Sequence, residues 1–299
     1  TFWQLARFRI RTALTKAQSK GETDVVVLRR FVKDAAVQMM ELEACGVKVD
    51  LQYCAAARLA EKYVHSISYY FYPDSSSSWE DVPILPSDSP LFSLPLASLV
   101  TLNAYRDVIT IKRTVPSLDT FRTAHRALKL FLIRRGIWGA RFGYLGGFHL
   151  TLLLTRVALL LPPSATPSHL IESFIKTYAQ WDWARDMVYP IPSREKEQSS
   201  SAVYKRILAK EPMVVLSIER PLSNLTYHAS QNSVDSLAWS LKEAHTMLAK
   251  GKTLSEVCYV PTEGGAVSPN TDPLKELANN YKAFVRLDVH FWGGNCMKG

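Results

Sequence analysis

A basic helix followed by a glycine-rich turn contains the residues of this sequence that are best suited to chemistry. Apolar residues between 118 and 135 recur on one side of a predicted helix. Four cationic side chains recur at helical spacing on the other side: Arg122, Arg126, Lys129 and Arg134. The run FGYLGGFHL follows at 142–150, and its glycines have no side chain that would keep a ligand away from the backbone. Such a helix and turn predict a site for a polyanion, either a nucleoside triphosphate or RNA. The alternative is a surface helix with solvated charges beside a glycine-rich junction.

A second candidate is Asp50, in the stretch GVKVDLQYC. Apolar residues at 47, 49 and 51 alternate with polar residues at 48, 50 and 52, which predicts a strand with one apolar and one polar face. The strand would present Asp50 to solvent from a rigid position. Two-metal nucleotidyl transfer needs rigid carboxylates to hold Mg²⁺, although an outward Asp on a strand is more often simply solvated.

Length, composition and charge favour a multidomain chain with an acidic partner. The 299 residues, 47% of them hydrophobic, can form about two or three domains with separate cores. The net charge of +9 favours nucleic acid, although solubility alone accounts for an excess of this size. The four cysteines show no metal-ligand spacing and no disulfide framework, which indicates reduced intracellular thiols. The longest apolar run, at 150–161, contains Arg156 and is too short to span a bilayer.

Apolar periodicity and turn residues predict a mainly helical chain with a few strands. Helices are expected at 2–18, 55–70, 96–108, 118–135, 147–161, 167–180 and 234–250. Strands at 37–42 and 47–53 are expected to form a hairpin around Cys45-Gly46. Thr166 and Ser233 are the expected caps of the last two helices.

The remaining segments predict irregular structure, with one more strand near the end. A Ser- and Pro-rich loop is expected at 73–95 and a charged loop at 193–202. A linker is expected at 253–273, and the residues at 281–292 alternate like the opening strand of another domain.

Four segments of the chain together identify a family. They are SLVTLNAYRDVITI at 98–111, FRTAHRALKLFLIRRGIWGARFGYLGGFHLTLLLTR at 121–156, TYAQWDW at 177–183 and MVVLSIERPLSNLTYHASQNS at 213–233. In this order they resemble the central domain of the eukaryotic poly(A) polymerases. Ordered similarity over roughly two thirds of a chain is rarely produced by chance matches of short patterns.

The resemblance implies an α+β chain with three parts. These are a remnant of the nucleotidyltransferase palm at 1–95, a mainly helical central domain at 96–250, and the start of a C-terminal α/β RNA-binding domain at 251–299. The implied activity is the addition of AMP from ATP to RNA 3′ ends with Mg²⁺ or Mn²⁺, as in nuclear polyadenylation of mRNA. The implied partners are ATP and an RNA 3′ end, with no membrane.

The resemblance also implies a role for Asp50 and exposes a departure from the family. Gly46, Asp50 and Leu51 match the strand that carries the family's third metal-binding carboxylate. The family's Gly-Ser turn and paired Asp-x-Asp strand have no counterpart before Gly46, where Asp24 and Asp34 stand alone. We therefore expect the chain to be a piece of a longer polypeptide, unable by itself to hold two metal ions or to extend a primer.

The resemblance implies nucleotide contacts at six further positions. Asn103 matches the family's asparagine directed at the ribose, and Lys129 matches its phosphate-facing lysine. Trp138 stands where the family has a tyrosine that reaches the phosphates. Gly146 and Gly147 match the backbone turn beside the adenine, and Phe148 replaces a small valine there, which puts adenine selectivity in question.

Two alternatives to an adenylyltransferase remain open from the sequence. One is a non-catalytic RNA-binding or scaffold protein that retains the central domain without the metal site. The other is a relative that uses another nucleotide, as the change to Phe148 would allow.

Overall fold

The computed structural model describes residues 2–19, 26–32, 38–54, 94–195, 204–207, 210–219 and 221–258. The predicted helix at 55–70, nearly all of the loop at 73–95 and the strand at 281–292 lie outside these residues. The described part combines helices with one antiparallel sheet in a separate stretch of the chain, so the predicted α+β class is confirmed. No described helix is both long and apolar enough to cross a membrane.

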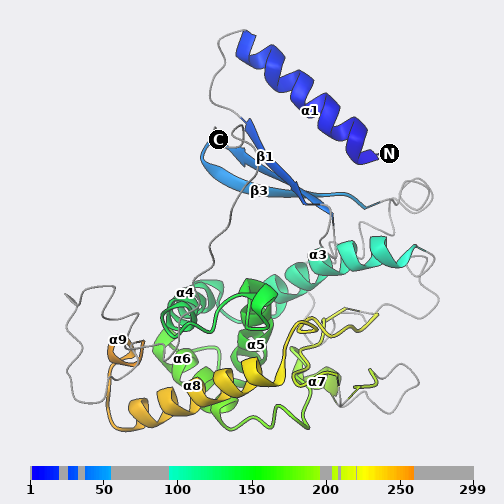
Figure 1. Ribbon diagram of the computed structural model, residues 1–299. Coiled ribbons are helices and arrows are strands. Elements are labelled where there is room, and N and C mark those ends of the chain that lie inside the picture. Colours follow the sequence, from blue (N-terminus) through cyan, green and yellow to red (C-terminus); the bar gives the residue numbers. More distant parts are fainter. Residues whose placement is uncertain are drawn as a thin grey trace, which may run out of the picture.

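The N-terminal part consists of one helix and a three-stranded sheet with the strands in sequence order. Its elements are α1 (Phe2–Ser19), β1 (Val26–Val32), β2 (Met39–Ala44) and β3 (Val47–Gln52). The predicted hairpin is confirmed, and Cys45 and Gly46 form its turn with φ values of 49° and 76°. Sequence periodicity missed β1. In Figure 1 this part lies beside one end of α3, apart from the other helices.

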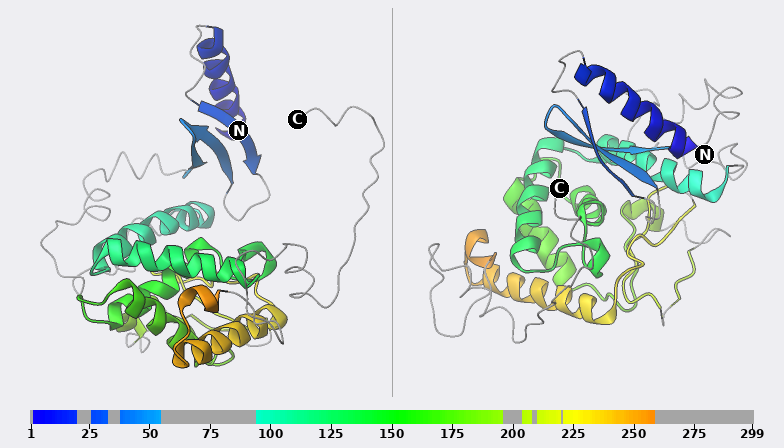
Figure 2. Two further views of the ribbon diagram at one scale, coloured as in Figure 1. Left: turned by 90° about the vertical axis from the view of Figure 1, so that its left-hand side faces the viewer. Right: turned by 45° about the horizontal axis from the view of Figure 1, so that its top comes forward.

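The rest of the described chain is mainly helical (Figures 1 and 2). Its elements are α3 (Leu96–Thr114), α4 (Leu118–Arg134), the short 3₁₀ helix η3 (Ala140–Phe142), α5 (Gly147–Leu160), α6 (Pro167–Ala179), α7 (Pro192–Glu195), α8 (Gln231–Ala249) and α9 (Leu254–Val257).

The core of this helical part forms where α4, α5, α6 and α8 pack against one another. The buried positions of α4 recur every three or four residues, as a helix with one apolar face requires: Phe121, Ala124, Leu128, Phe131 and Leu132. Helix α5 is apolar on most of its surface because it lies inside the bundle. The buried Tyr178 hydroxyl of α6 donates a hydrogen bond to the Leu153 carbonyl at 2.8 Å, so its burial is compensated.

Capping residues in the sequence predicted the start of one helix correctly and the start of another incorrectly, and a third helix was not predicted. Thr166 caps α6 as predicted. Helix α8 begins three residues earlier than expected, because Ser230 is the cap and Ser233 occupies the third helical position, where the two serines bond reciprocally. The expected linker at 253 begins instead with α9, which has a capping box between Thr253 and Glu256 that the sequence shows as T-x-x-E.

Candidate nucleotide-binding site

The cationic face of α4 is exposed along its whole length. Its four positive side chains all lie in contact with solvent: Arg122, Arg126, Lys129 and Arg134. Asp119 in the first turn pairs with Arg122 at 3.5 Å, an exposed contact that contributes little to stability. The helix therefore presents positive charge to solvent while its opposite face is buried in the core.

Lys129 and Trp138, two of the predicted nucleotide contacts, lie together. The Lys129 ammonium is 5.5 Å from the centre of the Trp138 ring, a cation–π distance. The loop after α4 brings the indole there, because a backbone bridge joins Trp138 to Leu145 and the Gly139 N–H donates to the Leu145 carbonyl at 2.9 Å. Gly139 has a φ of 123°, which a residue with a side chain would adopt only under strain.

The predicted Gly146-Gly147 turn begins α5. Gly146 is the N-cap of the helix and Gly147 is its first residue. A Cβ atom placed on Gly147 would meet nothing within 4 Å, whereas one on Gly146 would lie 3.2 Å from the Ala140 Cβ. The backbone is thus accessible from the Gly147 side. Free N–H groups and the helix dipole favour an anion at such an end.

His125 ties α4 to this turn, and the sequence did not suggest it. Its Nε2 atom lies 3.3 Å from the Gly147 carbonyl oxygen and 3.2 Å from Thr151 Oγ1. Burial lowers the pKa of His125, and together with the nearby charge of Lys129 it outweighs the bond to the Gly147 carbonyl, which raises the pKa. The imidazole is therefore mainly neutral near pH 7. The spacing of four residues between His125 and Lys129 was the signal that could have linked them.

Phe148 and His149 complete the first turn of α5. Phe148 is half-buried and packs against the hydrophobic core, so part of its ring is occupied by protein. His149 accepts a hydrogen bond from the Gly146 N–H through Nδ1 at 3.3 Å, and its pKa is lowered by burial. The base-stacking or crowding role of Phe148 stays a prediction.

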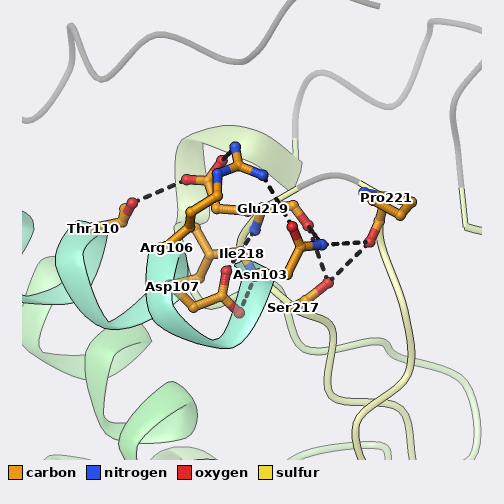
Figure 3. Close-up of polar contacts among 8 residues, drawn as sticks. All are labelled: Asn103, Arg106, Asp107, Thr110, Ser217, Ile218, Glu219 and Pro221. Atoms are coloured by element: carbon orange, nitrogen blue, oxygen red, sulfur yellow. Dashed lines mark hydrogen bonds and ion pairs between the residues drawn. The ribbon is translucent and has the colours of Figure 1, made fainter. Parts of the chain in front are cut away.

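Asn103 lies in α3, within a buried polar network (Figure 3). Its Nδ2 atom lies 3.4 Å from the carbonyl oxygens of both Glu219 and Pro221, and its Oδ1 accepts from Arg106 Nη1 at 3.0 Å. All of its amide groups have protein partners. Its predicted contact with a ribose stays a prediction, and such a contact would have to compete with these bonds.

The network around Asn103 contains a buried ion pair that was not predicted from the sequence. Arg106 pairs with Glu219 at 2.6 Å, with both side chains 6% exposed, and Thr110 donates to the other Glu219 oxygen at 2.9 Å. Asp107 accepts from the backbone N–H groups of Ile218 at 3.2 Å and Glu219 at 2.8 Å. Burial raises the pKa of Asp107 to about 7, and the charge of Glu219 adds to this while the two N–H groups and Arg106 oppose it.

Asp50 lies on the polar face of the sheet, as its position in the alternating pattern predicts. It is exposed, and it lies opposite Glu41 on β2. Arg30 of β1 holds both oxygens of that glutamate at 2.6 Å. Every residue of β3 is exposed, so the described residues leave the apolar side of this strand only partly covered.

The described residues do not fit a two-metal centre. They contain no group of three His, Cys, Asp or Glu side chains that could hold a metal ion. Glu41, the carboxylate nearest to Asp50 in the strand register, is committed to Arg30. Asp50 therefore offers one carboxylate and the described chain offers it no free partner in the sheet.

Comparisons with known proteins relate this chain to poly(A) polymerases. Residues 120–255 match the poly(A) polymerase central domain. A poly(A) polymerase of Dictyostelium discoideum is 34% identical over 152 residues, which are 51% of this chain and 17% of that protein. Nuclear poly(A) polymerase 4 of Arabidopsis thaliana is 29% identical over 218 residues, which are 72% of this chain and 27% of that relative. This chain thus spans between 17% and 27% of the length of these two relatives.

The match covers the helical bundle from α4 to the start of α9, so this bundle resembles a poly(A) polymerase central domain. Over this part the chain is similar to eukaryotic poly(A) polymerases. Among solved structures, mtPAP in complex with GTP covers 78% of this chain and 47% of its own, with 8% identity and a TM-score of 0.48. A likeness this distant adds nothing to the assignment, which rests on the sequence relatives.

Proposed function

We propose that this chain is part of a poly(A) polymerase and that it binds ATP between α4 and the start of α5. The observation that carries the proposal is the convergence of Lys129, Trp138 and the Gly146-Gly147 turn in a chain whose relatives are poly(A) polymerases. These residues lie within one short stretch of chain, and the folded loop at 136–146 connects them.

Each of these groups has a distinct part in the proposed site. The Lys129 ammonium is a flexible point charge that suits a triphosphate, and the N–H groups at the start of α5 suit a phosphate or the polar edge of a base. The Trp138 indole offers a flat face and one N–H donor. The remaining exposed cations of α4 suit the phosphates of an RNA primer.

In the proposed reaction an RNA 3′-hydroxyl attacks the α-phosphate of ATP and releases pyrophosphate. A divalent metal ion, when bound, would supply charge stabilisation at the phosphates. Asp50 is proposed as one of its ligands. The residues between α4 and the start of α5 would supply nucleotide positioning and positive charge. We propose a nuclear location on the basis of the nuclear relatives in Arabidopsis thaliana.

A calorimetric titration of the purified 299-residue chain with ATP tests the proposal. Lys129→Ala is expected to weaken ATP binding roughly tenfold to a hundredfold, because a charge-assisted contact is lost. Arg126→Ala is the matched control, since it removes the same charge from the same exposed face of α4. It is expected to change the affinity less than about threefold.

Two results would count against the proposal. Equal losses in the two variants would show a general electrostatic patch in place of a specific phosphate contact. A wild-type chain that binds RNA but not ATP would favour the non-catalytic RNA-binding protein.

A further inference from the structure

The hydrogen bonds around His125 define which of its ring nitrogens carries a proton. A carbonyl oxygen only accepts, so the 3.3 Å contact with the Gly147 oxygen requires a proton on Nε2 of His125. The Thr151 hydroxyl donates to the same carbonyl at 2.9 Å, which leaves its oxygen free to accept from Nε2 at 3.2 Å. One imidazole N–H is thus shared between two oxygens of the first turn of α5. This assignment follows from satisfying all three contacts.

The glycine turn is held from two sides by histidines. His125 from α4 holds the Gly147 carbonyl, and His149 within α5 accepts from the Gly146 N–H at 3.3 Å. Two consecutive glycines have large conformational freedom, so a turn made from them keeps one shape only where other groups fix it. His149 belongs to the same helix as the turn, whereas His125 fixes the turn relative to a different helix.

We propose that His125, with Thr151, is a positioning residue that fixes the Gly146-Gly147 turn in register with Lys129 on α4. The two α4 side chains are one helical turn apart, so the helix that carries Lys129 also sets the position of the turn. This role rests on the proposed function. There, Lys129 contacts the phosphates and the Gly146-Gly147 backbone contacts another part of the nucleotide, and His125 keeps these two groups at a fixed separation. His125 acts through the turn and need not touch the nucleotide.

The charge environment of His125 agrees with this role. Of the groups packed around it, α5 contributes the neutral Thr151 hydroxyl and Gly147 carbonyl, and α4 contributes the stacked Phe121 ring and the Lys129 charge. With burial and Lys129 both lowering its pKa, His125 stays neutral and keeps a single ring proton. That proton is the one that the two oxygens of α5 share.

Hydrogen exchange measured by mass spectrometry on the 299-residue chain tests the positioning role. His125→Leu removes the donor at similar size, and it is expected to accelerate exchange of the amides at 146–151 roughly three- to tenfold. His125→Gln restores an N–H near the position of Nε2 and is expected to recover most of the protection. His169→Leu, at an exposed histidine of α6, is the matched control and should leave these amides unchanged.

The outcomes separate the positioning role from nucleotide binding. Faster exchange at 146–151 in His125→Leu, with an unchanged melting temperature and recovery in His125→Gln, supports the role. Unchanged exchange there overturns it, whatever happens to ATP. An ATP affinity that falls in His125→Leu and recovers in His125→Gln supports both proposals. Faster exchange in a chain whose wild type does not bind ATP supports the positioning role and rejects the proposed function.

Discussion

At the scale of single residues, the contact between Lys129 and Trp138 is the basis of the proposed nucleotide site. Their contact at 5.5 Å places a cation against an aromatic face next to the start of α5. A tyrosine at the position of Trp138, as in the family, would offer a hydroxyl that both donates and accepts, whereas indole donates only. The proposed site would thus differ from the family's in hydrogen bonding while keeping the charge of Lys129.

Phe148→Val tests nucleotide choice at the same scale. The ring is half-buried, so its replacement is expected to cost about 1–2 kcal/mol of folding stability as well as to open space beside the proposed base. A hydrophobic contact changes discrimination by roughly 1–3 kcal/mol. We expect the wild type to bind ATP best, with a narrower margin over GTP, CTP and UTP than the variant shows. Competition titrations with the four triphosphates measure this margin, and a wild type that prefers CTP or UTP would contradict the assignment to ATP.

The burial of Arg135 is not evident from its position in the sequence. At the end of the basic helix it resembles its solvated neighbours, yet its side chain is fully buried. It bonds to the Val257 carbonyl at 2.9 Å and pairs with Glu243 of α8. Arg135→Ala is therefore expected to destabilise the domain by about 1–3 kcal/mol, because the Val257 carbonyl and the partly exposed Glu243 both lose their partner. Urea unfolding measures this, and Arg126→Ala should differ from wild type by less than about 0.5 kcal/mol.

At the scale of elements, the polar face of α3 joins the segment 213–221 through buried charges (Figure 3). Arg106 and Glu219 are both 6% exposed, so removing one of the two leaves a buried charge that has lost its ion pair. Glu219→Gln is expected to lower the free energy of unfolding by about 3–5 kcal/mol. Glu256→Gln, which breaks the exposed pair between Lys252 and Glu256, should cost less than about 1 kcal/mol. Comparable costs in the two variants would show that the α3 network is solvated.

The same network predicts a dependence of stability on pH. The pKa of Asp107 is raised from 3.8 to about 7 in the folded chain, chiefly by burial. The folded state therefore holds a proton that the unfolded state has lost, and the resulting stabilisation is complete below about pH 4 and is lost as the pH rises towards 7. Unfolding at several pH values should show a more negative slope between pH 4 and 7 for wild type than for Asp107→Asn. Parallel curves would show that Asp107 is ionised throughout this range.

Sequence periodicity predicted most of the helices because their apolar faces point into one core. The bounds of α4, α5 and α6 differ from the predicted ones by a single residue. The start of α8 was missed because Ser230 and Ser233 are both good caps, and the choice between them depends on their mutual bonds. The strand β1 was missed because its sequence, VVLRRFV, does not alternate between apolar and polar residues.

At the scale of the whole molecule, some of the predicted site residues lie close together in the sequence, whereas others have partners that only the tertiary fold brings near. Lys129, Trp138 and the glycine turn lie within one short stretch of chain, so local structure brings them together. Asn103 is buried by Glu219 and Pro221, more than a hundred residues later, and only the tertiary fold creates that contact. The spacing of Asn103, Arg106, Asp107 and Thr110 along one face of α3 was a visible signal of a buried polar stripe.

Photo-crosslinking would locate the bound nucleotide on the chain. The 299-residue chain would be irradiated with ATP that carries an azido group on the adenine, digested, and mapped by mass spectrometry. We predict an adduct within residues 138–151 that unlabelled ATP competes away and that Lys129→Ala weakens, while Arg126→Ala leaves it unchanged. Adducts only outside this stretch, or labelling that excess ATP does not reduce, would contradict a nucleotide site between α4 and the start of α5.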